Sequence, residues 1–174
     1  MGTSYALVHY PKIDTEQINN FRRIYDPQFN LVGPHITIVF PIRDQIGKDR
    51  LTRHIASTLG NHTAFPIRLN GLQVSGDNRL FLLVEEGKTE AIRLHNALYT
   101  GPLTDYRLRQ MPFLPHLTLG QVSVDKCDKA LHEAEQLQLD YECVLDRLHL
   151  IEVNDQRTQI LWSKEFFLSD RSSD

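Results

Sequence analysis

The sequence predicts an α+β fold of two similar lobes related by a pseudo-two-fold axis, with antiparallel sheets facing a central groove and helices outside. Three observations predict it. An order of strand, helix, loop and strand occurs twice along the chain. The tetrapeptide Pro-His-x-Thr opens the last strand of each copy, and a further helix and strand follow each copy.

The first copy begins with a short apolar segment, SYALVH, that is typical of a buried strand. In the helix that follows, Ile18, Phe21 and either Ile24 or Tyr25 fall on one face, and Asp14 or Thr15 is a suitable N-cap. The expected elements are a strand at 4–9, a helix from about 14 to 24, a strand at 33–40, a helix at 48–59 and a strand at 64–74.

The second copy repeats this order, with Ala91, Leu94 and Leu98 at helical spacing in its first helix. Gly76-Asp77-Asn78 predicts a hairpin turn between the copies, and residues 154–157 predict another near the end. Exchange of strands between the lobes would explain why the copies are not simple tandem units. The expected elements are strands at 79–85, 114–120, 141–153 and 158–168 and helices at 88–99 and 126–137.

The size and composition of the chain fit one soluble domain. Its 174 residues, 41% hydrophobic and 24% charged, predict a single bilobal domain over residues 1–168 and a flexible tail at 169–174. The net charge of −3 argues against broad binding to duplex nucleic acid, which needs a basic face. It leaves room for a nucleotide or an RNA end held by a few local arginines.

Sequence features relevant to location favour the cytoplasm. Cys127 and Cys143 form neither a CxxC pair nor a zinc ligand set, so two reduced thiols are expected. The N-terminus has no signal-peptide pattern, and no apolar run approaches the roughly 18 residues of a membrane helix. We therefore expect a cytoplasmic protein without a membrane partner, and no obligate protein partner is evident.

The two Pro-His-x-Thr segments are the candidate catalytic motifs. Alternate residues of a strand share a face, so His35 lies beside Thr37 and His116 beside Thr118. If the two lobes face each other, two imidazoles and two hydroxyls converge on one site. A neutral imidazole can then accept a proton from water while a protonated one donates to a leaving oxygen.

Other chemistries fit these residues less well. Neither motif has a second His, Cys or carboxylate two to five residues on, so a metal site is a weak alternative and no metal or other cofactor is expected. A serine hydrolase lacks its G-x-S-x-G elbow. Each motif alone is more often a structural histidine. The prediction rests on the occurrence of two motifs in matching surroundings.

The paired motifs in duplicated α+β halves resemble the 2H phosphoesterase superfamily, which includes 2′-5′ RNA ligase-like proteins, over roughly residues 4–168. The resemblance implies a bilobal fold, a metal-free site, and action on 2′,3′-cyclic phosphates or 2′-5′ linkages. It assigns catalysis to His35, Thr37, His116 and Thr118. Many members place an arginine soon after the second motif, where this sequence has Gln121.

Substrate contacts are expected near the ends of the motif strands. Aromatic rings there are able to stack on a base, although rim or core packing explains them equally well. Arginines flanking the motifs are able to attract a polyanion, but exposed arginines are also common for solubility. The candidate residues are Tyr10, Phe40, Phe113, Arg43, Arg107 and Arg109.

The sequence therefore predicts a metal-independent phosphodiesterase that hydrolyses the 2′,3′-cyclic phosphate of an RNA end or nucleotide and leaves a 2′-phosphate. One alternative is an ATP-independent 2′-5′ RNA ligase that uses the same acid–base pair in reverse. Another is a nucleotide- or RNA-binding module whose catalysis is vestigial. Intact His and Thr in both motifs favour an enzyme, because binding alone needs no acid–base pair.

Overall fold

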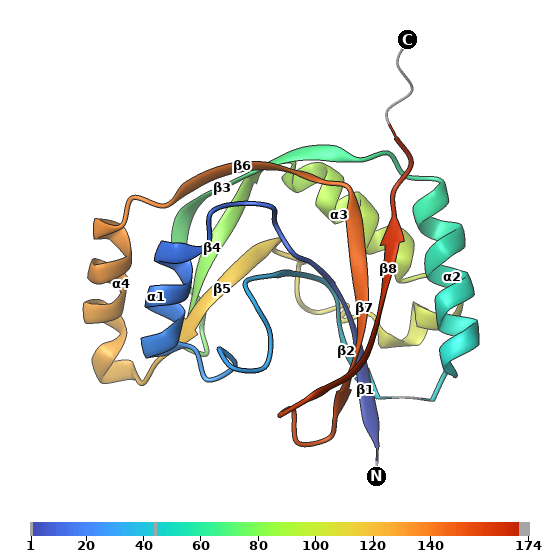
Figure 1. The fold of residues 1–174 in the computed structure, drawn as a ribbon, viewed down its shortest axis with the longest axis horizontal. Helices are drawn as coiled ribbons and strands as arrows, with labels where there is room; N and C mark the ends of the chain where they lie inside the picture. Colours follow the sequence, from blue (N-terminus) through green and yellow to red (C-terminus); the bar gives the residue numbers. More distant parts are fainter. Residues whose placement is uncertain (1, 44, 171–174) are drawn as a thin grey trace.

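The computed structural model describes residues 2–43 and 45–170. In these residues eight antiparallel strands form one sheet in the order β6-β3-β4-β5-β2-β1-β7-β8, with four α-helices and two 3-10 segments (Figure 1). The elements are β1 (Thr3–His9), α1 (Glu16–Tyr25), β2 (Ile36–Arg43), α2 (Lys48–Gly60), β3 (Phe65–Val74), β4 (Arg79–Glu86), α3 (Lys88–Leu98), β5 (His116–Gln121), α4 (Cys127–Gln136), β6 (Asp140–Leu145), β7 (Arg147–Asn154) and β8 (Ile160–Phe167), with 3-10 segments at Gly101–Tyr106 and Val124–Lys126.

The sheet is continuous, which corrects the expectation of separate sheets in two lobes. One half holds β3, β4, β5 and β6, and the other holds β1, β2, β7 and β8. The halves meet where β2 pairs with β5, through the single Cα pair Ile36 and Leu117. Because the two strands pair at this one position, the sheet bends there while remaining one sheet. A two-fold relation between the halves stays a prediction.

The expected strand at 141–153 is also corrected, because it is two strands. β6 pairs with β3 in one half, whereas β7 pairs with β1 and β8 in the other. The break falls at Asp146, whose carbonyl accepts the N–H of Leu168 at 2.9 Å. One straight strand is unable to reach partners in both halves. The chain therefore crosses between the halves at this residue, as expected from strand exchange.

The other expected elements agree with the structure to within a few residues. Both hairpins are present, since β3 pairs with β4 and β7 with β8. At the C-terminal end, Ser169 is fixed by backbone hydrogen bonds to His62 and Ala64 at 2.8 and 3.0 Å, although it belongs to the expected tail. Residues 171–174 of that tail lie outside the described residues.

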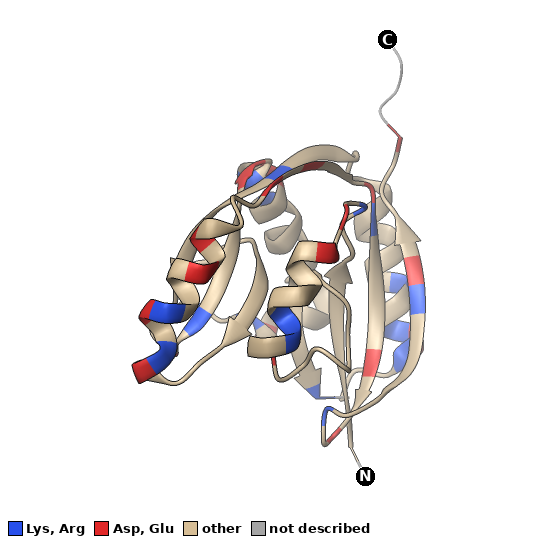
Figure 2. Cartoon of the chain, turned by 60° about the vertical axis from the view of Figure 1, so that its left-hand side comes forward, with Lys and Arg blue, Asp and Glu red and all other residues tan. Residues whose placement is uncertain are grey.

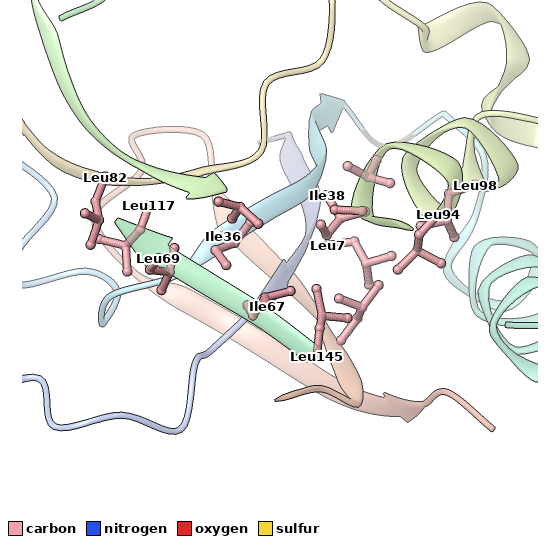
Figure 3. Packing of buried hydrophobic residues seen from close by; sticks show 14 of the residues in the cluster. Leu7, Ile36, Ile38, Ile67, Leu69, Leu82, Leu94, Leu98, Leu117 and Leu145 are labelled. Atoms are coloured by element: carbon pink, nitrogen blue, oxygen red, sulfur yellow. The ribbon is translucent and has the colours of Figure 1, made fainter. Parts of the chain in front are cut away.

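The four helices contribute to one hydrophobic core on a single face of the sheet. Leu94 and Leu98 of α3 are fully buried in this core, as is Ile18 of α1. Figure 3 shows Ile36 of β2 and Leu117 of β5 within the same set of packed side chains. The core thus spans both halves and supports the strands that carry the two motifs.

The opposite face of the sheet has a smaller apolar cluster on the neighbouring strands β1 and β7. Ala6, Val8, Ile151 and Val153 are each less than 8% exposed there. Figure 2 shows basic and acidic residues interspersed over the outer faces of the helices, as the small net charge suggests. Within the described ranges, no helix is long and apolar enough to cross a membrane.

Candidate functional site

The two motifs line one pocket. Ile36 and Leu117, the middle residues of the motifs, are Cα partners across β2 and β5, and both are fully buried in the core. Strand alternation then turns their neighbours to the other face. His35, Thr37, His116 and Thr118 all line the pocket on that face. Two imidazoles and two hydroxyls are therefore brought together, as the sequence predicts.

Both histidine rings are held by the same local hydrogen bond. His35 Nδ1 lies 2.9 Å from the carbonyl oxygen of Gly33, and His116 Nδ1 lies 2.6 Å from that of Leu114. A carbonyl only accepts, so Nδ1 carries the hydrogen in each ring. In the neutral ring, Nε2 then has a free lone pair, which is the form that a general base needs.

Burial lowers the pKa of both histidines. The pKa of His116 falls to about 4, mainly because burial penalises the charged ring, and the nearby His35 and Arg79 lower it further. Burial is also the main cause that lowers the pKa of His35. The interaction of the two rings agrees with their closeness in the pocket. At neutral pH the unliganded protein therefore holds a neutral pair.

Phe81 of β4 supports the second motif. Its ring stacks on that of His116 with the centroids 3.6 Å apart and the planes 22° apart. Phe81 is the Cα partner of Thr118 and is 9% exposed. The sequence analysis did not identify this residue. Phe81 could be identified only from the register in which β4 pairs with β5, the second motif strand. A single sequence does not reveal this register.

Helix α3 holds the first motif strand from behind. His95 Nδ1 donates to the carbonyl of Ile38 at 2.7 Å, and the hydroxyl of Tyr99 accepts the N–H of Phe40 at 3.0 Å. The β1–β2 ladder shifts register in this region, between the pairs that involve Tyr5 and Leu7. Two side chains at the C-terminal end of α3 thus form hydrogen bonds with backbone groups of β2 near the register shift. Phe40 lines the pocket in this part of β2.

The three aromatic candidates have different surroundings. Phe40 lines the pocket. Tyr10 lies beside it, with its ring 6.4 Å from that of His35 and 4.9 Å from that of His149. Phe113 stacks on His95 at 3.9 Å and packs against the core, so its surroundings are those of a packing residue.

The three candidate arginines lie outside the pocket lining. Arg43, Arg107 and Arg109 are exposed, and Arg107 donates to the side chain of Asn96 at 2.9 Å. The arginines that do line the pocket are Arg79 and Arg157, which the sequence analysis did not select.

Arg79 begins β4 beside the second motif. It is the Cα partner of Gln121, which also lines the pocket, and it forms a half-exposed ion pair with Asp77 at 3.2 Å. Asp26 is an acidic residue of the lining, but buried Arg22 neutralises it at 2.8 Å. Among the charged residues of the lining, Asp26 is thus neutralised by Arg22, whereas Arg79 is paired with the exposed carboxylate of Asp77.

The described residues contain no cluster of three or more His, Cys, Asp or Glu side chains placed to hold a metal ion. The imidazoles of the pocket are instead accompanied by two threonines. Hydroxyls and neutral imidazoles are suited to hydrogen bonding and proton transfer. Metal independence stays a prediction that chelation tests.

Comparison with known proteins gives relatives along most of the chain. A Bacillus pumilus protein named "Putative phosphoesterase" is 30% identical over 155 residues, covering 84% of this chain and 87% of the relative. A Bacillus licheniformis protein of the same descriptive name is 28% identical, covering 84% and 88%.

Solved structures share the fold at low identity. E. coli LigT in complex with 3′-AMP superimposes with a TM-score of 0.62 at 14% identity, covering 97% of this chain and 99% of LigT. TT0787 of Thermus thermophilus gives a TM-score of 0.52 at 16% identity, with 97% and 96% covered. The family model of the 2′-5′ RNA ligase superfamily matches residues 10–157. The chain therefore belongs to the 2′-5′ RNA ligase superfamily of 2H phosphoesterases.

Proposed function

We propose that this protein hydrolyses the 2′,3′-cyclic phosphate of a nucleotide or RNA end through His35 and His116, without a metal. The observation that carries the proposal is the single pocket that both histidines line, each ring fixed through Nδ1. Family membership and phosphoesterase relatives support the reaction class. The complex of LigT with 3′-AMP supports a nucleotide ligand.

In the proposed reaction, one neutral imidazole accepts a proton from water as the water oxygen bonds to phosphorus. The other imidazole, protonated, donates its proton to O3′ as the bond from phosphorus to O3′ breaks, which leaves a 2′-phosphate. Thr37 and Thr118 donate hydrogen bonds to the non-bridging oxygens as negative charge develops.

Arg79 supplies fixed positive charge in this scheme. It lines the pocket and lowers the pKa of His116 through its charge, which agrees with a position near the reacting phosphate. Its guanidinium is suited to phosphate oxygens because it presents a planar set of donors. Many members of the family place an arginine soon after the second motif, and in this chain Arg79 lies beside that position as the Cα partner of Gln121.

The test is turnover of adenosine 2′,3′-cyclic phosphate, followed by ³¹P NMR, which separates the 2′- and 3′-phosphate products. His35→Ala and His116→Ala should each lower kcat by about 10²- to 10⁴-fold. The double variant should lose far less than the product of the two effects, because the pair works as one unit.

The threonine variants Thr37→Val and Thr118→Val should lose roughly 10- to 100-fold, since each removes one hydrogen bond and leaves proton transfer intact. His132→Ala on the exposed face of α4 is the matched control and should keep full activity. Absence of turnover by the wild-type protein, or full activity of either motif histidine variant, would reject the proposal.

A ligase function uses the same residues in reverse and is distinguished by its product. RNA ending in a 2′,3′-cyclic phosphate is mixed with RNA that has a 5′-hydroxyl. Formation of a 2′-5′ junction, resistant to nucleases that cleave only 3′-5′ links, would favour ligation. Release of a 2′-phosphate alone would favour hydrolysis.

A further inference from the structure

The pocket extends well beyond the two histidines, along strands β1 and β7. Val8 of β1 is the Cα partner of Thr37, and from there the lining follows β1 through Ala6 to Ser4. Ser4 is in turn the Cα partner of Val153 on β7. The four residue steps of a strand from Val8 to Ser4 span about 13 Å. The pocket therefore has room for more than one phosphate group.

The floor of this extension is apolar. Ala6, Val8, Ile151 and Val153 form a buried cluster separate from the main core, and all four also line the pocket. Such a surface suits the ribose and base of a nucleoside and offers nothing to a second charged group. The floor thus separates the part of the pocket lined by the histidines and threonines of the two motifs, the His/Thr centre, from the next polar feature of the lining.

That feature is Arg157, in the turn between β7 and β8. It lines the pocket at the end remote from Arg79, since Arg79 and Gln121 lie toward the opposite end of the antiparallel strands. In the part of the chain that the structure describes, its guanidinium makes no hydrogen bond or ion pair with another side chain. The carboxylate of nearby Asp155 accepts the N–H of Gly2 at 2.6 Å.

The backbone of the turn is well fixed. The N–H of Arg157 donates to the carbonyl of Asn154 at 2.9 Å, and Asn154 Oδ1 accepts the N–H groups of Thr158 and Gln159. Arg157 itself adopts a left-handed backbone conformation with φ of 52°. The backbone of Arg157 is therefore held at a defined end of the pocket.

We propose that Arg157 forms a second phosphate subsite, which binds a phosphate on the 5′ side of the nucleoside whose cyclic phosphate reacts. The inference rests on the proposed function and extends it. The His/Thr centre takes the cyclic phosphate, the apolar floor takes the nucleoside, and Arg157 takes the next phosphate. A guanidinium suits this role because its fork of donors matches phosphate oxygens.

Two sources carry such a phosphate, a free nucleotide with a 5′-phosphate and the last internal linkage of an RNA 3′ end. The test compares kcat/KM for three substrates. They are adenosine 2′,3′-cyclic phosphate, its 5′-phosphorylated form, and a diadenosine dinucleotide that ends in a 2′,3′-cyclic phosphate. Preference for the second substrate identifies a free nucleotide, and preference for the dinucleotide identifies an RNA end.

The wild-type protein should prefer a substrate with the additional phosphate by roughly 10- to 100-fold, mainly through KM, as expected for a charge-assisted contact. In Arg157→Asn this preference should fall toward one. Asparagine is chosen because it tolerates the left-handed backbone at this position. Arg53→Ala, on the exposed face of α2, is the control and should keep the wild-type preference.

Turnover without any preference, or a preference that survives in Arg157→Asn, would overturn the subsite while leaving the proposed function intact. If none of the three substrates is turned over, the proposed function fails. Equilibrium binding then tests Arg157 separately, using adenosine 2′-phosphate and adenosine 2′,5′-bisphosphate as probes. Equal affinity of the wild-type protein for both probes would reject the subsite, and tighter binding of the bisphosphate that Arg157→Asn removes would support it.

Discussion

Replacement of His116 by Asn should change how the stability of the protein depends on pH. Burial lowers the pKa of this ring to about 4, whereas the unfolded chain has the ordinary value of about 6.5. Below pH 6.5 the unfolded chain therefore binds a proton that the folded ring does not bind. Stability from neutral His116 is fully present above pH 6.5 and is lost as the pH falls toward 4.

The size of the effect follows from the shift. At pH 5 the unfolded ring is protonated and the folded ring is mostly neutral, which costs the wild-type protein about 2 kcal/mol relative to pH 7.5. His116→Asn has no titrating ring, and its amide is placed to donate to the carbonyl of Leu114 as Nδ1 does. Relative to the wild-type protein, the variant should gain about 2 kcal/mol between pH 7.5 and pH 5.

The assay is urea unfolding at several pH values from 7.5 to 5, analysed as the difference between variant and wild-type protein. Loss of the stack on Phe81 destabilises the variant, but this contribution does not depend on the titration of the ring. His132→Asn, at an exposed position of α4, is the matched control for the same substitution made away from the pocket. A constant difference for His116→Asn would refute the argument that the ring is desolvated in the fold.

Three further predictions concern catalysis and the support of the site. Activity on a 2′,3′-cyclic nucleotide should survive excess EDTA, and a loss restored by zinc or manganese would indicate a metal centre. The pH profile of kcat/KM should be bell-shaped with its maximum below pH 6.5, because the acid must be charged and burial lowers the pKa of both histidines. A rate that rises steadily to pH 10 would instead indicate attack by hydroxide. Tyr99→Phe removes the acceptor of the Phe40 N–H, so it should lower the free energy of unfolding by about 1–3 kcal/mol and raise KM through displacement of Phe40. Tyr106→Phe, on the neighbouring 3-10 segment, serves as the control. Unchanged stability in both variants would exclude a role of the Tyr99 hydroxyl in supporting the first motif strand.

The sequence predicts well those features that depend on nearby residues. The helices show apolar residues at helical spacing, and the turn at 76–78 joins β3 and β4 as expected. The shared face of His35 and Thr37 follows from strand alternation, and both residues line the pocket. These predictions succeed because each depends on spacing within a few residues.

Features that depend on pairing between distant strands were missed. The division of 141–153 at Asp146 becomes visible only when the partners of β6 and β7 are known. Phe81 and Arg79 reach the site through the register of β4 with β5, and Tyr99 reaches it through the packing of α3 behind β2. Neither the register nor the packing leaves a local pattern in one sequence.

In the proposed mechanism, the charges of the pocket link phosphate binding to the protonation of His35 and His116. Burial and the charge of Arg79 both lower the pKa of His116, so the unliganded pocket holds neutral imidazoles beside a fixed cation. A bound phosphate brings negative charge to the same place. It offsets Arg79 and favours the protonated form of a neighbouring imidazole, which raises its pKa. In the proposed mechanism, the imidazole that acts as general acid then binds its proton most strongly when the phosphate is present. Arg79, which we propose attracts this phosphate, lowers the pKa of His116 in its absence.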